Sequence, residues 1–167
     1  MKKTDRSEQN LPQKITVLSV GPADEDHATL SGILETAQWP LCPGSEWTLE
    51  TTPSLVGALS ALQKKNPPLV VCESDLGAGG WRELWEFAAA LPDPPFVIVT
   101  SRLADEYLWA EALNLGVYDV LAKPFEPAEV VRTLSQAWLY RCSRQARKRN
   151  PALVGHSAAA SGSRMAV

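Results

Sequence analysis

Residues 67–73 read PPLVVCE, two prolines followed by an apolar run and then a carboxylate. Short β-branched runs bounded by proline, glycine, aspartate or serine are typical of strands that are buried on both faces of a parallel sheet. Three other stretches share this pattern, and a threonine-rich stretch between loop signals predicts a fifth strand. The five predicted strands are Ile15–Val20, Trp47–Thr52, Leu69–Cys72, Phe96–Val99 and Val117–Leu121.

Amphipathic segments fill the gaps between these strands. Their apolar residues recur at three- and four-residue spacing, as in Leu108, Ala112 and Leu115, which is the helical period. Gly116 is predicted to end one helix, as glycine commonly does just past a helix C-terminus. The predicted helices span about 24–37, 54–65, 81–91, 104–115 and 127–147. This alternation predicts an α/β fold of five β–α units, in which helices cover both faces of a doubly wound parallel sheet.

Length and composition predict one domain with flanking segments. A chain of 167 residues with 45% hydrophobic and 21% charged residues has room for one globular core. Residues 1–130 carry a net charge of −10, whereas residues 131–167 carry +7 and no acidic side chain. We expect a flexible segment at 1–13, a domain at 14–147 with an extended last helix, and a flexible basic tail at 148–167.

The cysteines and the hydropathy pattern indicate a cytoplasmic protein. Cys42, Cys72 and Cys142 are an odd number without C-x-x-C spacing, and Cys72 lies inside an apolar strand. No apolar run is long enough to span a membrane, and no signal-peptide pattern is present.

Several motifs together resemble the receiver domain of bacterial response regulators, the CheY-like superfamily, over about residues 14–140. The motifs are Pro67–Glu73, Asp75-Leu76, Gly79-Gly80, Val97–Ser101, and Gly116 leading to Lys123-Pro124-Phe125. The resemblance implies a flavodoxin-like fold with strand order 2-1-3-4-5. It also implies a stand-alone receiver protein in two-component, or phosphorelay, signal transduction.

The resemblance also assigns site residues. In an active receiver an aspartate at the end of the third strand accepts the phosphoryl group, and two acidic residues after the first strand help to hold a divalent metal. A Ser or Thr after the fourth strand and a Lys after the fifth bind the phosphoryl oxygens. Thr100 and Lys123 match these last two positions, and Pro124 matches a proline that the family tends to join through a cis peptide.

Three departures from the family pattern each indicate a loss of the phosphoryl-transfer chemistry of receivers. Glu73 stands at the acceptor position, one methylene longer than aspartate, so it is a poor nucleophile for the same pocket but a fair mimic of the modified state. Gly21 and Pro22 stand where the acidic pair belongs, so Mg²⁺ binding is expected to be lost or weak. Val120 stands at the aromatic switch position. We therefore expect no catalytic residue, no metal or other cofactor and no enzymatic activity.

The individual site residues have alternatives. Glu73 either pairs with Lys123 or is solvated, and the Thr100 hydroxyl either lines the pocket or satisfies the backbone. Asp24, Glu25 and Asp26 are expected to cap and face the first helix, with a substitute metal site as the other reading. His27 is expected at the surface of that helix.

The partner prediction rests on the face formed by the fourth helix, fifth strand and fifth helix. Trp109 and Trp138 are candidate anchors there for a signalling protein or histidine kinase, bound without phosphorylation. The extended last helix also suits a homodimer. No membrane partner is expected, and the 20 residues after Arg147 are too few for a helix-turn-helix output domain, which makes nucleic acid an unfavoured partner.

Two other functions stay open. One is a weakly phosphorylatable receiver that uses Asp75 or the Asp24–Asp26 cluster. The other is a flavodoxin-like ligand-binding protein, although the glycines at 77–80 lack the pattern of a P-loop or a dinucleotide fingerprint.

Overall fold

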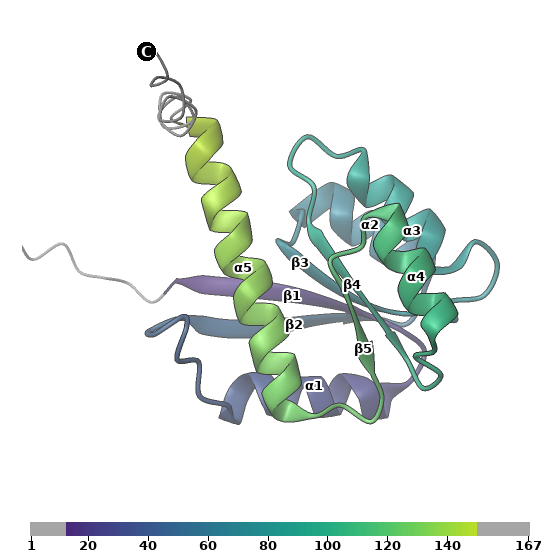
Figure 1. The fold of residues 1–167 in the computed structure, drawn as a ribbon, viewed down its shortest axis with the longest axis horizontal. Helices are drawn as coiled ribbons and strands as arrows, with labels where there is room; N and C mark the ends of the chain where they lie inside the picture. The colour runs from purple at the N-terminus through teal and green to yellow at the C-terminus, as the bar shows by residue number, and fades with distance from the viewer. Residues whose placement is uncertain (1–12, 150–167) are drawn as a thin grey trace, which may run out of the picture.

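A computed structural model of the chain describes residues 13–149. Strands and helices alternate through this range (Figure 1). In chain order they are β1 Lys14–Val20, α1 Asp24–Thr36, β2 Glu46–Thr52, α2 Leu55–Lys65, β3 Leu69–Glu73, α3 Gly80–Ala89, β4 Phe96–Ser101, α4 Glu106–Leu115, β5 Asp119–Ala122 and α5 Pro127–Arg149.

The strands form one sheet in the order β2-β1-β3-β4-β5, and every neighbouring pair is parallel. The predicted fold class and strand order are confirmed. Because all five strands run the same way, their carboxyl ends meet at one edge of the sheet, where open α/β sheets place their functional residues.

Two hydrophobic layers enclose the sheet. Val71, Ile98 and Leu121 face α1 and α5, whereas their chain neighbours Val70, Val99 and Val120 face α2, α3 and α4. Successive strand residues point to opposite faces, so one apolar run such as Leu-Val-Val-Cys supplies both layers. Figure 1 shows α1 and α5 together on one side, away from the other three helices.

The element boundaries depart slightly from the prediction. β5 begins at Asp119, not Val117, because Gly116 ends α4 in a left-handed conformation and the Val117 amide still donates to the Ala112 carbonyl at 3.0 Å. α5 continues two residues past its predicted end, to Arg149. Of the predicted flexible segments, residues 1–12 and 150–167 lie outside the described range. Within residues 13–149, no helix is both long and apolar enough to cross a membrane.

The extended part of α5 is held by a polar clamp at the loop before β4. Arg141, only 5% exposed, binds Asp93 and donates to the Pro94 carbonyl at 3.0 Å. Arg144 donates to the same carbonyl at 2.5 Å, and the Gln145 amide donates to Asp93 at 3.2 Å. These contacts fix α5 at residues 141–145, shortly before its predicted end at 147.

Candidate functional site

The carboxyl edge of the sheet brings together residues that are far apart in the sequence. β3 ends at Glu73, which lies beside Thr100 of β4, and Lys123 follows β5 directly. Gly21 and Pro22 follow β1. The predicted cis peptide between Lys123 and Pro124 is confirmed.

Lys123 is the centre of an ion cluster at this edge. Its ammonium group binds Glu73 through Oε2 and Asp26 through Oδ2, the latter at 2.5 Å. The lysine side chain is only 4% exposed, and the two carboxylates are 16% and 21% exposed. Of the two readings for Glu73, pairing with Lys123 is therefore the one that the structure supports.

The remaining carboxylate oxygens of the cluster also have partners. Glu73 Oε1 accepts from the amide of Ser74 at 3.0 Å and from its hydroxyl at 3.1 Å. Asp26 Oδ1 lies 3.7 Å from an Arg102 guanidinium nitrogen. The two carboxylates thus face one buried and one exposed cation, so the cluster is close to neutral without any added ion.

Asp26 has a role that the sequence did not reveal. The N-cap of α1 is Ala23, and no side chain caps it. The prediction that the three acidic residues cap this helix is wrong in that respect, although all three lie in the first turn, where the helix dipole favours negative charge. Asp26 binds Lys123, 97 residues away in the chain, and only the folded arrangement of α1 against the sheet brings the two together.

The space around Lys123 is largely filled. The pocket enclosed by Glu73, Thr100, Lys123 and the first turn of α1 has a volume of about 10 Å³, close to the least that holds one water molecule. A more open cleft of about 390 Å³ adjoins it, lined by the three cluster residues Asp26, Glu73 and Lys123 together with Pro22, Asp75 and Arg102. A phosphoryl-sized group would fit the outer cleft but not the inner pocket.

Thr100 and Val120 are both buried. The Thr100 hydroxyl donates to the Cys72 carbonyl at 3.3 Å, so in this structure it satisfies the backbone and does not bind the ion cluster. Val120 is fully buried between the sheet and the α2, α3 and α4 layer. Burial, and next the charge of Glu73, raise the pKa of the Cys72 thiol, which removes this neighbour of Glu73 as a nucleophile.

His27 is half-buried, so its predicted surface position is wrong. Its Nε2 lies 2.9 Å from the Gly21 carbonyl, and Nδ1 lies 2.8 Å from the Ser19 hydroxyl. Because a carbonyl can only accept, Nε2 carries the proton that it donates. His27 therefore ties the first turn of α1, which also carries Asp26, to the end of β1.

The donor set does not fit a magnesium ion. The residues after β1, Gly21 and Pro22, have no side-chain oxygen, and both nearby carboxylates already bind Lys123. Among residues 13–149, no group of three His, Cys, Asp or Glu side chains could hold a metal. Mg²⁺ prefers several oxygens in octahedral geometry, which this edge does not offer.

We predict that millimolar MgCl₂ leaves the thermal unfolding midpoint unchanged beyond the effect of NaCl at equal ionic strength. A ligand that binds only the folded state must raise this midpoint. Differential scanning calorimetry measures it, and a magnesium-specific rise that is lost in Asp26→Asn would contradict the prediction.

The tryptophans proposed as anchors are half-buried. Trp109 on α4 packs against the layer of α2, α3 and α4, whereas Trp138 on α5 packs against the opposite layer, with α1. The exposed aromatics near these positions are Tyr107, which is 86% exposed, and Tyr140, which is 62% exposed. The sequence did not distinguish these tyrosines from buried ones.

Comparisons with known proteins identify the fold of the chain. No protein-family model matches the sequence, and no curated protein matches it. Among solved structures, a protein of Chloroflexus aurantiacus described as a response regulator is 23% identical, with a TM-score of 0.64 over 75% of this chain and 98% of that chain. The signal receiver domain of an HD domain-containing protein from Pseudomonas fluorescens is 22% identical, with a TM-score of 0.66 over 78% and 99%. The chemotaxis response regulator CheY4 of Vibrio cholerae is 17% identical, with a TM-score of 0.63 over 75% and 99%. The chain thus has the fold of receiver domains.

Proposed function

We propose that this chain is a receiver-type module of two-component signal transduction that acts by protein–protein contact, without enzymatic activity and without being phosphorylated. The observation that carries the proposal is the ion cluster, in which Lys123 is already neutralised by Glu73 and Asp26. In receivers, the lysine at this position binds a phosphoryl oxygen, and here a carboxylate oxygen of Glu73 holds that place.

The cluster supports a fixed conformation. A phosphoryl group bound to Lys123 would share the ammonium group with two carboxylates whose charge repels it, and phosphoryl transfer would proceed without the metal that normally neutralises its charge. The 10 Å³ pocket inside the cluster offers no room for such a group, which would have to approach Lys123 from the 390 Å³ cleft, beside the carboxylates of Glu73 and Asp26. Val120, which is small and fully buried, cannot swing outward as an aromatic switch residue does.

The exposed apolar side chains support an interaction role on the face of α4, β5 and α5. Eight large hydrophobic side chains are exposed among the described residues, and six of them lie on α4, on α5 or in the turn before α4. These six are Leu103, Tyr107, Leu113, Leu115, Leu139 and Tyr140. Exposed apolar and aromatic side chains are typical of protein interaction sites, and their concentration on α4, α5 and the turn before α4 makes the face of α4, β5 and α5 the proposed contact for a signalling partner.

Incubation with acetyl phosphate and Mg²⁺ is expected to leave the intact mass of the protein unchanged. A receiver with an intact acidic pair, treated in parallel, gains the mass of one phosphoryl group and serves as the positive control. The Glu73→Asp variant is also expected to stay unmodified, because Gly21 and Pro22 still provide no metal ligand.

The alternative phosphoryl acceptor, Asp75, can be tested by substitution. Asp75 is exposed and borders the outer cleft, and its carboxylate accepts weakly from the Gly77 amide at 3.4 Å. A phosphoryl adduct on the wild-type chain that disappears in Asp75→Ala would overturn the proposal and make the chain a phosphorylatable receiver. Thermal-shift screening with nucleotides and flavins tests the flavodoxin-like ligand-binding alternative.

A further inference from the structure

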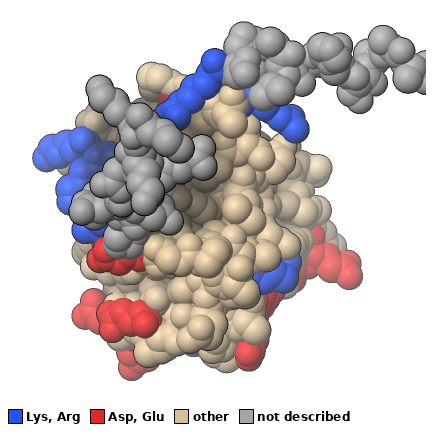
Figure 2. All heavy atoms as spheres, turned by 90° about the vertical axis from the view of Figure 1, so that its left-hand side faces the viewer, with Lys and Arg blue, Asp and Glu red and all other residues tan. Residues whose placement is uncertain are grey.

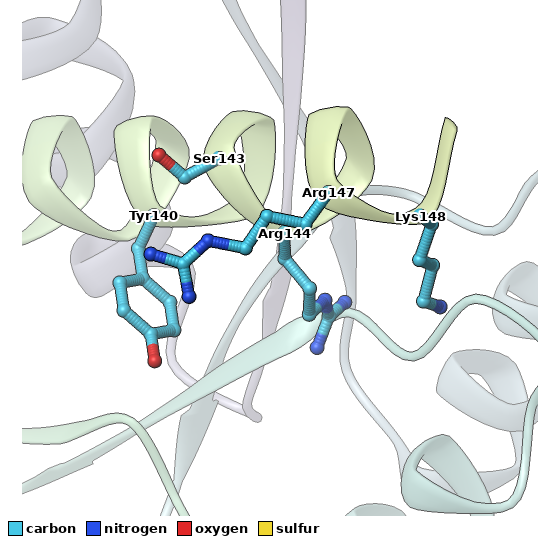
Figure 3. Close-up of a pocket in the computed structure, with 5 residues that line it drawn as sticks. All are labelled: Tyr140, Ser143, Arg144, Arg147 and Lys148. Atoms are coloured by element: carbon cyan, nitrogen blue, oxygen red, sulfur yellow. The ribbon is translucent and has the colours of Figure 1, made fainter. Parts of the chain in front are cut away.

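The last turns of α5 extend past the sheet at the edge opposite the ion cluster (Figure 1). This part of the helix presents Tyr140, Ser143, Arg144, Arg147 and Lys148, which line a hollow of about 390 Å³. We call these five residues the α5 end. Figure 3 shows Tyr140, Arg144 and Lys148 reaching from the helix to the same side, and Arg147 running back along the helix toward Tyr140.

The α5 end is held in place by two kinds of contact. The clamp at Asp93 and Pro94 fixes the helix itself. Phe96, at the start of β4, packs edge-on against the Tyr140 ring at 5.7 Å, and the Arg144 guanidinium lies over the Phe96 ring at 4.6 Å. Because Tyr140 and Arg144 are positioned before any partner arrives, a partner need not order these two side chains.

Within the described part of the chain, Arg144 of the α5 end lies 3.7 Å from Asp93, whereas the charges of Arg147 and Lys148 are not neutralised. No carboxylate of residues 13–149 forms a salt bridge with Arg147, Lys148 or Arg149, and the sequence contains no Asp or Glu after Glu129. Figure 2 shows Lys and Arg atoms gathered at one end of the molecule, apart from most of the Asp and Glu atoms. An approaching anion would meet this end first.

The helix dipole explains only part of the arrangement. Cations in the last turn of a helix are favoured by the partial negative charge there. The helix dipole does not account for the exposed Tyr140 two turns earlier, nor for the hollow that Tyr140 and Arg147 line. An aromatic ring beside several cations is instead a surface that receives both a carboxylate and an apolar side chain.

We propose that the α5 end binds a short acidic segment of another protein, in which an aromatic side chain next to the carboxylates packs against Tyr140. The charge distribution favours such a segment over nucleic acid. Residues 1–130 carry a net charge of −10, which repels a long polyanion, whereas a short segment meets only the local positive field. The site lies at the opposite edge from Lys123, so it stands whether or not the chain is phosphorylated.

Fluorescence anisotropy with a labelled peptide of glutamates around one central phenylalanine tests this proposal on the full chain. Binding is expected at low ionic strength and is expected to weaken as salt is added. Arg147→Glu/Lys148→Glu is expected to weaken binding about tenfold or more through like-charge repulsion, and Tyr140→Ala about threefold through loss of the aromatic contact.

The matched control is Lys64→Glu/Lys65→Glu, which makes the same charge change in the last turn of α2. This control is expected to bind the peptide with nearly wild-type affinity. If both double variants weakened peptide binding equally, the net charge of the protein would explain the binding, and the proposal would be overturned. Two other results would also overturn it: no peptide binding at low salt, or tighter binding of a labelled single-stranded oligothymidylate of equal length, which would make the α5 end a nucleic-acid surface.

Discussion

Replacing Lys123 by methionine is expected to lower the free energy of unfolding by about 2–3 kcal/mol. The change leaves Glu73 and Asp26 facing each other at the sheet edge without their shared cation. Breaking a buried ion pair from one side typically costs about 3–5 kcal/mol, and we take a lower value because the carboxylates are 16% and 21% exposed. Urea denaturation followed by tryptophan fluorescence measures the loss.

The cause of that loss can be isolated by a mutant cycle. In the Glu73→Gln/Asp26→Asn background, Lys123→Met is expected to cost much less, because no uncompensated carboxylate remains. Lys64→Met, at an exposed lysine of α2, is the control and is expected to be nearly neutral. An equal cost in both backgrounds would mean that Lys123 stabilises the fold by packing alone, and the ion cluster would lose its assigned role.

The Asp93→Ala variant is expected to be about 2 kcal/mol less stable than the wild type, because it leaves the Arg141 guanidinium buried with only the Pro94 carbonyl as partner. Burial lowers the pKa of Arg141 below its usual range, and the charge of Asp93 opposes this effect. The clamp also fixes the extended helix, so amide hydrogen exchange in the last turns of α5 is expected to accelerate. Mass-spectrometric hydrogen exchange measures this change.

Two variants make this test specific. Asp93→Ala/Arg141→Met is expected to recover part of the stability, because an apolar side chain then replaces the buried charge. Glu86→Ala removes an exposed carboxylate from α3 and is expected to change neither stability nor exchange at α5. If the last turns of α5 kept wild-type protection in Asp93→Ala, the clamp would not be what holds them.

The ion cluster around Lys123 and the clamp around Asp93 lie at opposite edges of the sheet. The ion cluster fixes the carboxyl edge of the sheet, whereas the clamp fixes α5 at the amino edge, where β4 begins. Because they share no residue, variants of one are expected to add to variants of the other in their effect on stability. The proposed partner surfaces on α4 and α5 can therefore be tested without disturbing Lys123.

The sequence by itself determined the fold class and much of the candidate site. Four apolar strand patterns and a threonine-rich fifth predict a parallel sheet, and the residues that follow the strands must share one edge of it. Glu73, Thr100 and Lys123 could be placed together on that ground alone. The sequence favours a pair between Glu73 and Lys123, because Glu73 ends one predicted strand, Lys123 follows another, and their charges are opposite.

Only the tertiary structure decided which other charges join these residues. Asp26 and Asp93 lie in an acidic helix turn and in a proline-rich loop, where the sequence indicates local roles such as capping or turning. Their partners, Lys123 and Arg141, are 97 and 48 residues away. Long-range ion pairs of this kind leave no periodic pattern in the sequence. They depend on how helices pack across the sheet, and so the first turn of α1 and the end of α5 could be assigned to Lys123 and Asp93 only once the chain was folded.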